Sequence, residues 1–289
     1  MRIIVLGSSS SWYVNDLRRA AAGRHEIAAV SYKQLASQID GHDASWHAGG
    51  IDLGRADAIL VRSMPPGSLE QVVFRMDALG QLASAGMSVV NSPRAIEVAV
   101  DKYLATARLQ EAGFLVPPTV ACQTVEQAMQ AFETLGRDVV VKPLFGGEGR
   151  GVTRVTNEAI ARQTFQELDS SESVLYLQAF IDHDGCDWRL LVIGQRVLGM
   201  GRRHPTDWRT NISRGAVGEP LEVTPDLAEM AHKGASAVGA TIAGVDLLPG
   251  NDGQLYALEV NAVPGWRALA KVCEQDVSRL VLDHLASLG

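Results

Sequence analysis

Cysteines are scarce in this sequence of 289 residues. Only Cys122, Cys186 and Cys273 occur, far apart in the chain and odd in number. This excludes a disulfide framework and a paired metal-binding motif, and it predicts reduced thiols in a cytoplasmic protein. Long apolar runs are also missing, since no segment approaches the ~20 residues of a membrane span and the run 3–6 is too short for a signal peptide. We therefore expect neither export nor a membrane anchor.

An excess of positive charge is missing as well. The 26 lysines and arginines are outnumbered by 33 acids, for a formal charge of −7. Because nucleic acids and membrane surfaces bind cationic faces, we expect neither as a partner. Several nucleotide motifs are absent too: the dinucleotide fingerprint needs three glycines where only Gly7 follows the first apolar run, and no P-loop or protein kinase motif occurs.

The first ~90 residues alternate between apolar strands and amphipathic helices, which predicts a small Rossmann-like lobe. We expect strands at 2–6, 26–31, 57–62 and 87–91 and helices at 12–22 and 68–84. Arg62 ends the third strand, where open α/β sheets bind ligands. It is therefore either a ligand for a substrate carboxylate or a solvated loop arginine.

A smaller α+β unit follows. We expect helices at 93–99, 101–112, 124–136 and 157–168 and strands at 119–122, 139–142 and 152–155. The strand 139–142 ends in Lys142, and four of the six residues 146–151 are glycines. Glycines let backbone N–H groups converge on an anion, and the lysine supplies positive charge. The segment therefore predicts a phosphate cover that is mobile without nucleotide.

The last part of the chain reads as mainly strands. We expect strands at 174–181, 188–193 and 196–202, an irregular segment to 215, a helix at 225–239, two strands containing Asp246 and Glu259, and a helix at 273–287. The second and third strands are joined by Gly194-Gln195, a plausible hairpin turn. Glu259 and Asn261 are two positions apart and leave one strand face together. If the Asp246 strand pairs alongside, buried oxygen ligands suited to Mg²⁺ would come together.

Arginines are concentrated between residues 188 and 215. This segment holds six arginines and one acid in a chain of net charge −7. Arginine suits bidentate binding of phosphate or carboxylate, so the segment predicts an anionic ligand. Arg196 lies beside the hairpin turn and is the first that we assign to the surface.

Short strings along the chain resemble the ATP-grasp superfamily, and within it RimK-type α-L-glutamate ligases. They are Asp101-Lys102, Val141-Lys142-Pro143, Gly146 to Gly151, Gln178-Ala179-Phe180-Ile181, Gly185-Cys186-Asp187-Trp188-Arg189, Arg209-Thr210-Asn211 with Arg214-Gly215, Gly244-Val245-Asp246 and Glu259-Val260-Asn261-Ala262-Val263-Pro264-Gly265.

This resemblance implies an ATP-grasp fold of mixed α/β and α+β class. Its parts would be a Rossmann-like lobe at 1–93, a central lid lobe at 94–177 and a C-terminal lobe with the metal site at 178–289. It implies an ATP-dependent ligase that joins a small-molecule or peptide carboxylate to an amino-acid amine, such as that of L-glutamate, through an acylphosphate. Mg²⁺ is the expected ion, with Mn²⁺ as a substitute, and a homo-oligomer is left open. The alternative is a non-catalytic ATP-binding sensor or partner module.

The resemblance also implies a role for each matched residue. ATP would be held by Lys102, Lys142, Gly146, Gly147, Gly149, Gln178, Ala179, Phe180, Ile181, Asp187, Arg209 and Asn211. The metal would be held by Asp246, Glu259 and Asn261, and the carboxylate or acylphosphate by Arg189, Arg203 and Arg214. Asp187 would bind the ribose, a role that Asp182 or Asp184 could share because the preceding connection is short. Ala179 occupies the position after the glutamine, where the family commonly has an acidic residue.

Overall fold

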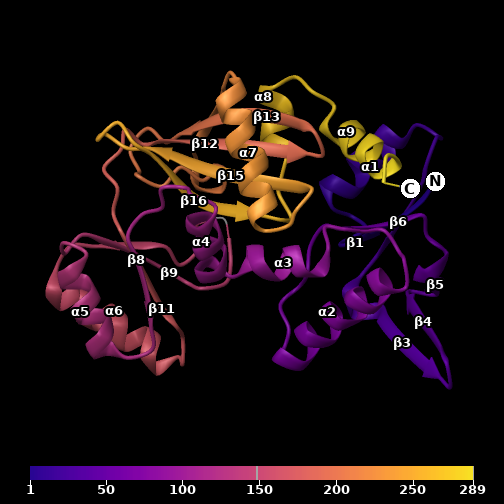
Figure 1. Ribbon diagram of the computed structural model, residues 1–289, viewed down its shortest axis with the longest axis horizontal. Coiled ribbons are helices and arrows are strands. Elements are labelled where there is room, and N and C mark those ends of the chain that lie inside the picture. The colour runs from indigo at the N-terminus through magenta and orange to yellow at the C-terminus, as the bar shows by residue number, and fades with distance from the viewer. Residues whose placement is uncertain (148, 289) are drawn as a thin grey trace.

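The structure, a computed structural model, describes residues 1–147 and 149–288. The glycine segment is thus described apart from Glu148, and the C-terminal lobe apart from Gly289. Figure 1 shows an indigo and purple lobe at one side, a magenta lobe below and an orange and yellow body above, with both termini beside each other. Within the described ranges, no helix has the length and apolar character needed to cross a membrane.

The first lobe contains a parallel sheet in the order β2-β1-β6-β7. Its elements are β1 (Arg2–Leu6), α1 (Trp12–Ala21), β2 (Glu26–Val30), β6 (Ala58–Val61), α2 (Leu69–Ser84) and β7 (Val89–Val90). Ile3 and Val5 pack with α1 and Ile4 and Leu6 with α2, so both faces are covered, as expected of a parallel sheet. The predicted elements of this lobe are confirmed.

A small antiparallel sheet in the same lobe was not predicted. It consists of β3 (Leu35–Asp40), β4 (Asp43–Ala48) and β5 (Ile51–Asp52), flanked by 3₁₀ turns at Tyr32–Gln34 and Leu53–Arg55. In β3 only the first residue is buried and the next five are exposed. The strand therefore lacks the apolar alternation by which a half-buried strand is recognised.

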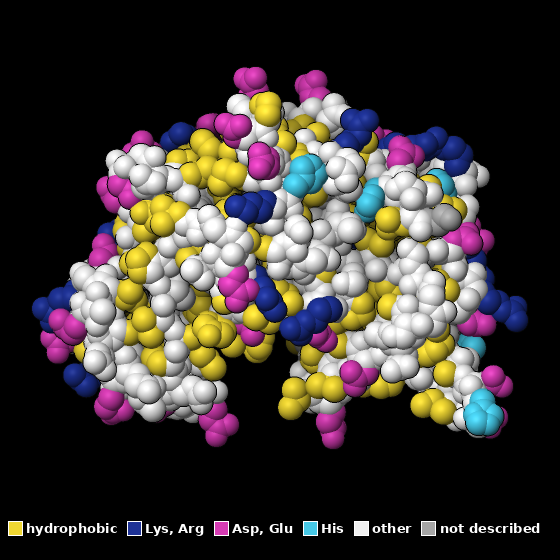
Figure 2. All heavy atoms as spheres, viewed as in Figure 1, with side chains coloured by type: hydrophobic (Ala, Val, Ile, Leu, Met, Phe, Trp, Pro, Cys, Tyr) yellow, Lys and Arg dark blue, Asp and Glu magenta, His cyan; other side chains and the backbone are white. Residues whose placement is uncertain are grey.

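The central lobe contains an antiparallel sheet in the order β10-β9-β11-β8. Its elements are α3 (Pro93–Val100), α4 (Lys102–Glu111), β8 (Thr119–Cys122), α5 (Val125–Thr134), β9 (Val139–Lys142), β10 (Thr153–Val155), α6 (Glu158–Ser170) and β11 (Leu175–Ala179). Helices α5 and α6 cover the sheet and bury Phe132 and Phe165 in a core of their own. Helices α3 and α4 instead contact β16 of the C-terminal sheet. Figure 2 shows the surface hollowed between this lobe and the α2 side of the first lobe.

The C-terminal sheet has the order β14-β13-β12-β15-β16. Its elements are β12 (Cys186–Ile193), β13 (Arg196–Arg203), a 3₁₀ turn (Ile212–Arg214), β14 (Val217–Pro220), α7 (Pro225–Ala237), β15 (Ile242–Pro249), β16 (Leu255–Asn261), α8 (Arg267–Val272) and α9 (Val277–Ala286). The predicted hairpin turn is confirmed, because Ile193 pairs with Arg196. β14 and α8 were not predicted, and the closing helix begins at Val277, later than expected.

Asn91 joins the first lobe to the C-terminal sheet. Its side chain is 3% exposed and donates to the carbonyls of Ile242 at 2.6 Å and Ala262 at 2.5 Å. Its Oδ1 accepts from the amides of Thr241 at 2.9 Å and Ile242 at 3.1 Å. One carboxamide thus satisfies four backbone groups at the ends of β15 and β16, the strands that carry the predicted metal ligands.

We predict that Asn91→Ala lowers the free energy of unfolding by about 3 kcal/mol, because buried donors and acceptors lose their partners. Urea denaturation would show a lower midpoint with an unchanged slope. Asn251→Ala is the matched control. Its exposed side chain makes one bond, to Asp182 at 2.9 Å, and its loss should cost less than about 0.5 kcal/mol. Equal midpoints for the two variants would contradict the role given to Asn91.

Candidate active site

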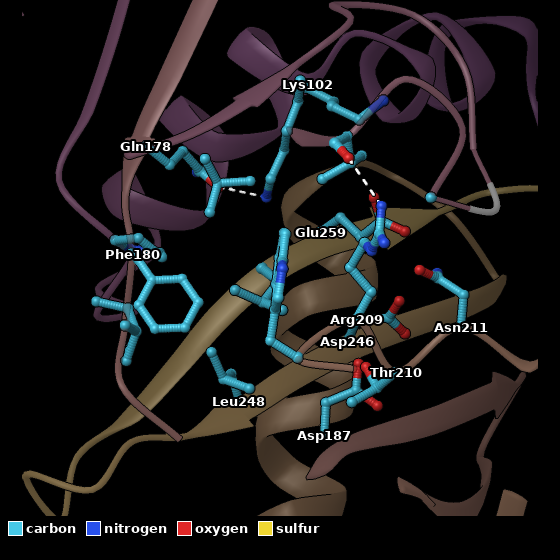
Figure 3. Close-up of a pocket in the computed structure, with 18 of the residues that line it drawn as sticks. Lys102, Gln178, Phe180, Asp187, Arg209, Thr210, Asn211, Asp246, Leu248 and Glu259 are labelled. Atoms are coloured by element: carbon cyan, nitrogen blue, oxygen red, sulfur yellow. Dashed lines mark hydrogen bonds between the residues drawn. The ribbon is translucent and has the colours of Figure 1, made fainter. Parts of the chain in front are cut away.

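A cavity lies between the central sheet and the C-terminal sheet, and Figure 3 shows its side chains around one space. Lys142 at the end of β9, Gln178 on β11 and Lys102 at the start of α4 line one side. Asp246 on β15 and Glu259 on β16 line the other and are direct partners in the strand register. Residues separated by more than a hundred positions therefore face each other. The strands that carry Asp246 and Glu259 pair side by side, as the predicted magnesium site requires.

Both lysines are bound to protein oxygens. Nζ of Lys102 donates to the carbonyl of Gly146 at 2.6 Å, and Nζ of Lys142 donates to Oε1 of Gln178 at 2.5 Å. Burial lowers the pKa of Lys142 to about 8, against the opposing charge of Glu259. Burial also lowers the pKa of Lys102. An anion that replaced these oxygens would favour the charged form of each lysine.

Asp246 belongs to a buried network of charges. Arg189 donates to its Oδ1 at 2.5 Å, and Arg202 lies 3.0 Å from its Oδ2. Burial alone would raise the pKa of Asp246, but the two guanidinium groups hold it below its usual range. Arg202 also donates to both oxygens of Asp187, at 2.7 and 2.5 Å. Burial would lower the pKa of Arg202, but the two carboxylates raise it.

Sequence reasoning gave Arg202 no role and assigned the carboxylate of Asp187 to the ribose. Asp187 lines the cavity, yet both of its oxygens accept from Arg202. A usable signal was present: a two-residue turn at Gly194-Gln195 fixes the hairpin register and sets Asp187 opposite Arg202. A ribose hydroxyl would share this carboxylate with the arginine.

Glu259 and Asn261 complete the predicted metal site. Nδ2 of Asn261 donates to Oε1 of Glu259 at 2.9 Å, so the two side chains lie together on β16. No group of three His, Cys, Asp or Glu side chains gathers anywhere in the described chain. Two carboxylates and an amide oxygen fit Mg²⁺, which takes few protein ligands and leaves positions for water and phosphate oxygens.

The glycine segment is held against the C-terminal lobe. Arg209 donates to the carbonyl of Val152 at 3.3 Å and Arg214 to that of Gly149 at 3.5 Å. Gly149 has a φ of +68°, and a Cβ there would collide with the side chain of Asn211.

The cavity below the glycine segment measures only about 120 Å³, well under the roughly 300–1,000 Å³ of typical ligand pockets. We therefore expect the segment to move outward when a nucleotide enters.

The predicted adenine-binding backbone lines the same cavity. The amides of Ala179 and Phe180 donate to the carbonyls of Pro118 and Asp138, at 2.8 and 2.9 Å. Among the described residues, the amide of Ile181 has no such partner and lies beside the cavity. The backbone amide of Ile181 is therefore available to donate a hydrogen bond to the adenine base.

The three arginines predicted for the substrate occupy different places. Arg189 lines a second, adjoining cavity together with Asn261. Arg214 reaches the glycine segment. Arg203 is exposed, donates to the carbonyl of Asp184 at 3.0 Å and lies 3.6 Å from Glu219. It does not line either of these two cavities.

Arg62 is buried, so its interpretation as a solvated loop arginine is wrong. The side chain is 8% exposed, lies 4.6 and 4.0 Å from the ring centroids of Tyr13 and Trp266, and donates to the carbonyl of Pro264 at 2.8 Å. It thereby fixes the segment that follows β16, the strand with the predicted metal ligands Glu259 and Asn261.

Two facing sheets, two lysines and two carboxylates on paired strands form a site whose chemistry suits a nucleotide with a divalent cation. The RimK-like ATP-grasp domain matches residues 99–285, and the chain belongs to this family. It is 33% identical to a tetrahydromethanopterin:alpha-L-glutamate ligase of Methanosarcina acetivorans, over 91% of this chain and 89% of that protein. It is 31% identical to the protein of the same name from Methanococcus maripaludis, over 98% and 97%.

Solved structures agree on the fold. The ATP-grasp ligase PsnB complexed with minimal precursor has a TM-score of 0.80 at 22% identity and 99% coverage of both chains. A RimK domain ATP-grasp protein from Sphaerobacter thermophilus has a TM-score of 0.76 at 24% identity, over 98% and 99%. The predicted ATP-grasp fold and RimK-type family are confirmed. The protein is an ATP-dependent carboxylate–amine ligase, and the alternative of a non-catalytic module is set aside.

We predict that nucleotide affinity depends on pH through Lys142. A phosphate beside the lysine favours its charged form, so affinity should be highest below about pH 8 and fall by up to about tenfold per pH unit above it. Calorimetric titration of a non-hydrolysable ATP analogue would measure this. Lys142→Met should weaken binding and flatten the profile, whereas the exposed Lys33→Met should leave it unchanged. A flat wild-type profile would refute the prediction.

We also predict that nucleotide slows amide exchange in the glycine segment. The amides of residues 146–147 and 149–151 should exchange fast in the free protein, because the segment opens to admit ligand, and slower with Mg²⁺ and an ATP analogue. Helix α5 serves as the internal control, since it packs into the core of the central lobe and that core contains none of the described residues of the glycine segment. Exchange rates that do not differ between the two states would contradict the opening.

Proposed function

We propose that the protein adds the amino group of L-glutamate to a carboxylate of a small molecule. In this reaction the carboxylate attacks the γ-phosphate of ATP, an acylphosphate forms and ADP leaves, and the amine then displaces phosphate. The observation that carries the proposal is the meeting of Lys102 and Lys142 with Asp246 and Glu259 across one cavity. The names of the two methanogen relatives support glutamate as the amine.

Each group in the cavity suits one part of this reaction. Lys102 and Lys142 would bind the phosphates, and the glycine segment 146–151 would exclude water that hydrolyses the acylphosphate. Arg209 and Asn211 would exchange their present contacts with the glycine segment for contacts with the γ-phosphate. Phosphoryl transfer depends on positioning and charge neutralisation, so no side-chain nucleophile is required.

A divalent cation would be held by Asp246, Glu259 and Asn261. Mg²⁺ is the proposed ion, and Mn²⁺ accepts the same oxygen ligands. When bound, it would neutralise charge on the phosphates during transfer. The lobe 94–177 is proposed as the moving lid and 178–289 as the fixed metal-bearing half, with 1–93 taking part in acceptor selection.

The route is tested by isotope transfer. Incubation with Mg²⁺, ATP, L-glutamate and a carboxylate labelled with ¹⁸O should yield ADP and phosphate that carries one label from the carboxylate. Label transfer occurs only if that oxygen has attacked phosphorus. Recovery of AMP and pyrophosphate would refute the acylphosphate route.

We predict that Glu259→Gln lowers kcat by about a thousandfold, or roughly 4 kcal/mol in activation free energy, because a charged metal ligand is lost. The measurement is ADP release with saturating glutamate and acceptor. Glu222→Gln, a change of the same kind at an exposed site, should keep the wild-type rate. Full turnover in the Glu259 variant would exclude this carboxylate from the reaction.

A further inference from the structure

A second cavity of about 670 Å³ adjoins the nucleotide cavity and shares Gly147, Asn211 and Glu259 with it. Its volume lies within the roughly 300–1,000 Å³ of small-molecule sites. Because Glu259 lies on the common wall, a carboxylate at the inner end would lie close to the transferring phosphate. The outer end is formed by α8 and the first lobe.

The walls of the second cavity combine apolar and cationic groups. Tyr13 of the first lobe, Val263 and Leu269 provide apolar surface. Among the residues that the structure describes, the charged lining residues are five cations, Arg150, Arg189, Arg202, Arg267 and Lys271, and one acid, Glu259. The cavity is therefore suited to an anion with an apolar portion.

Arg267 and Lys271 differ from the inner arginines. Arg189 and Arg202 are already paired with buried carboxylates. Arg267 and Lys271 are four residues apart on α8, so they share a helix face, and both are exposed. Within the part of the chain that the structure describes, neither forms an ion pair; Arg267 lies 5.5 Å from the ring centroid of Trp12. The outer rim thus holds two cations whose charge is not balanced by any acid among the described residues of the rim.

We propose that Arg267 and Lys271 bind a second, non-reacting carboxylate of the acceptor. The enzyme then selects acceptors with two anionic ends separated by an apolar segment: one end reaches Glu259 and Asn261, and the other reaches α8. An amino acid alone would fill little of this volume and would not use the apolar wall, so the acceptor is the occupant. This inference rests on the proposed ligase function and specifies its substrate class.

The test compares dicarboxylates with matched monocarboxylates. Suberate and octanoate, and sebacate and decanoate, have equal chain lengths and differ by one carboxylate. Ligand-observed NMR titrations would use full-length protein saturated with Mg²⁺ and a non-hydrolysable ATP analogue. The wild type should bind at least one dicarboxylate about tenfold more tightly than its partner, since two charged contacts are added. The double variant Arg267→Gln, Lys271→Gln should lose this preference.

Controls separate the possible causes. Lys271→Gln alone should show an intermediate preference and remains informative if the double variant folds poorly. Arg196→Gln, an exposed arginine at the hairpin turn, should keep the wild-type preference. Binding of the ATP analogue and of L-glutamate should not change in any of them.

Two results would overturn the inference: no dicarboxylate preference in the wild type, or a preference that survives in the double variant. A loss of L-glutamate affinity in the double variant would also overturn it, because the rim would then hold the amine substrate. Since the titration measures binding and not turnover, it can fail while ADP and phosphate are still formed, and the proposed function is judged by that separate assay.

Discussion

A buried network of four charges, alternating in sign across three neighbouring strands, underlies the site. Arg202 on β13, Asp187 and Arg189 on β12 and Asp246 on β15 each contact a partner of opposite charge. Burying a charge is costly unless it is paired and hydrogen-bonded, so each member requires the others. The network leaves the two lysines facing one further carboxylate, Glu259, with a positive remainder. A nucleotide with its divalent cation would suit this excess of positive charge, because the cation offsets part of the negative charge of the phosphates.

The glycine segment in this structure is held by the groups that the reaction would use elsewhere. Lys102, Arg209 and Arg214 each donate to a backbone carbonyl of residues 146–152. A phosphate oxygen carries negative charge and a carbonyl does not, so the phosphate oxygen is the stronger acceptor for these cationic donors. Nucleotide binding can therefore replace these contacts at a net gain. In the proposed mechanism, these hydrogen bonds would hold the glycine segment close to the site in the free protein until a nucleotide binds.

Much of the fold and of the candidate site could be predicted from local sequence, because the strand–lysine–glycine and Glu-x-Asn patterns place the chemically important residues close together in the chain. What the sequence did not reveal depends on tertiary contacts. The pairing of Arg202 with both Asp187 and Asp246 needs three strands in register. The small sheet β3-β4-β5 has exposed strands without apolar alternation, and the short helix α8 gives little periodic signal. The role of Asn91 in joining two lobes could not be predicted either, because its partners lie at least 150 positions away in the chain.

In the proposed mechanism, the two cavities have different functions, and different elements form them: strands β15 and β16 line the first, and Tyr13 and helix α8 line the second. In the proposed reaction, activation of the carboxylate depends on Asp246 and Glu259, which are direct partners on β15 and the edge strand β16. A substitution of Asp246 would also disturb the buried charge network. Selection of the acceptor depends on Tyr13, Arg267 and Lys271, of which the two α8 cations are exposed and lie outside that network. Changes on α8 can thus alter which acceptor binds without unbalancing the buried charges. The shared wall at Glu259 connects the two functions, because only an acceptor that fits the outer rim brings its reacting carboxylate to the phosphate.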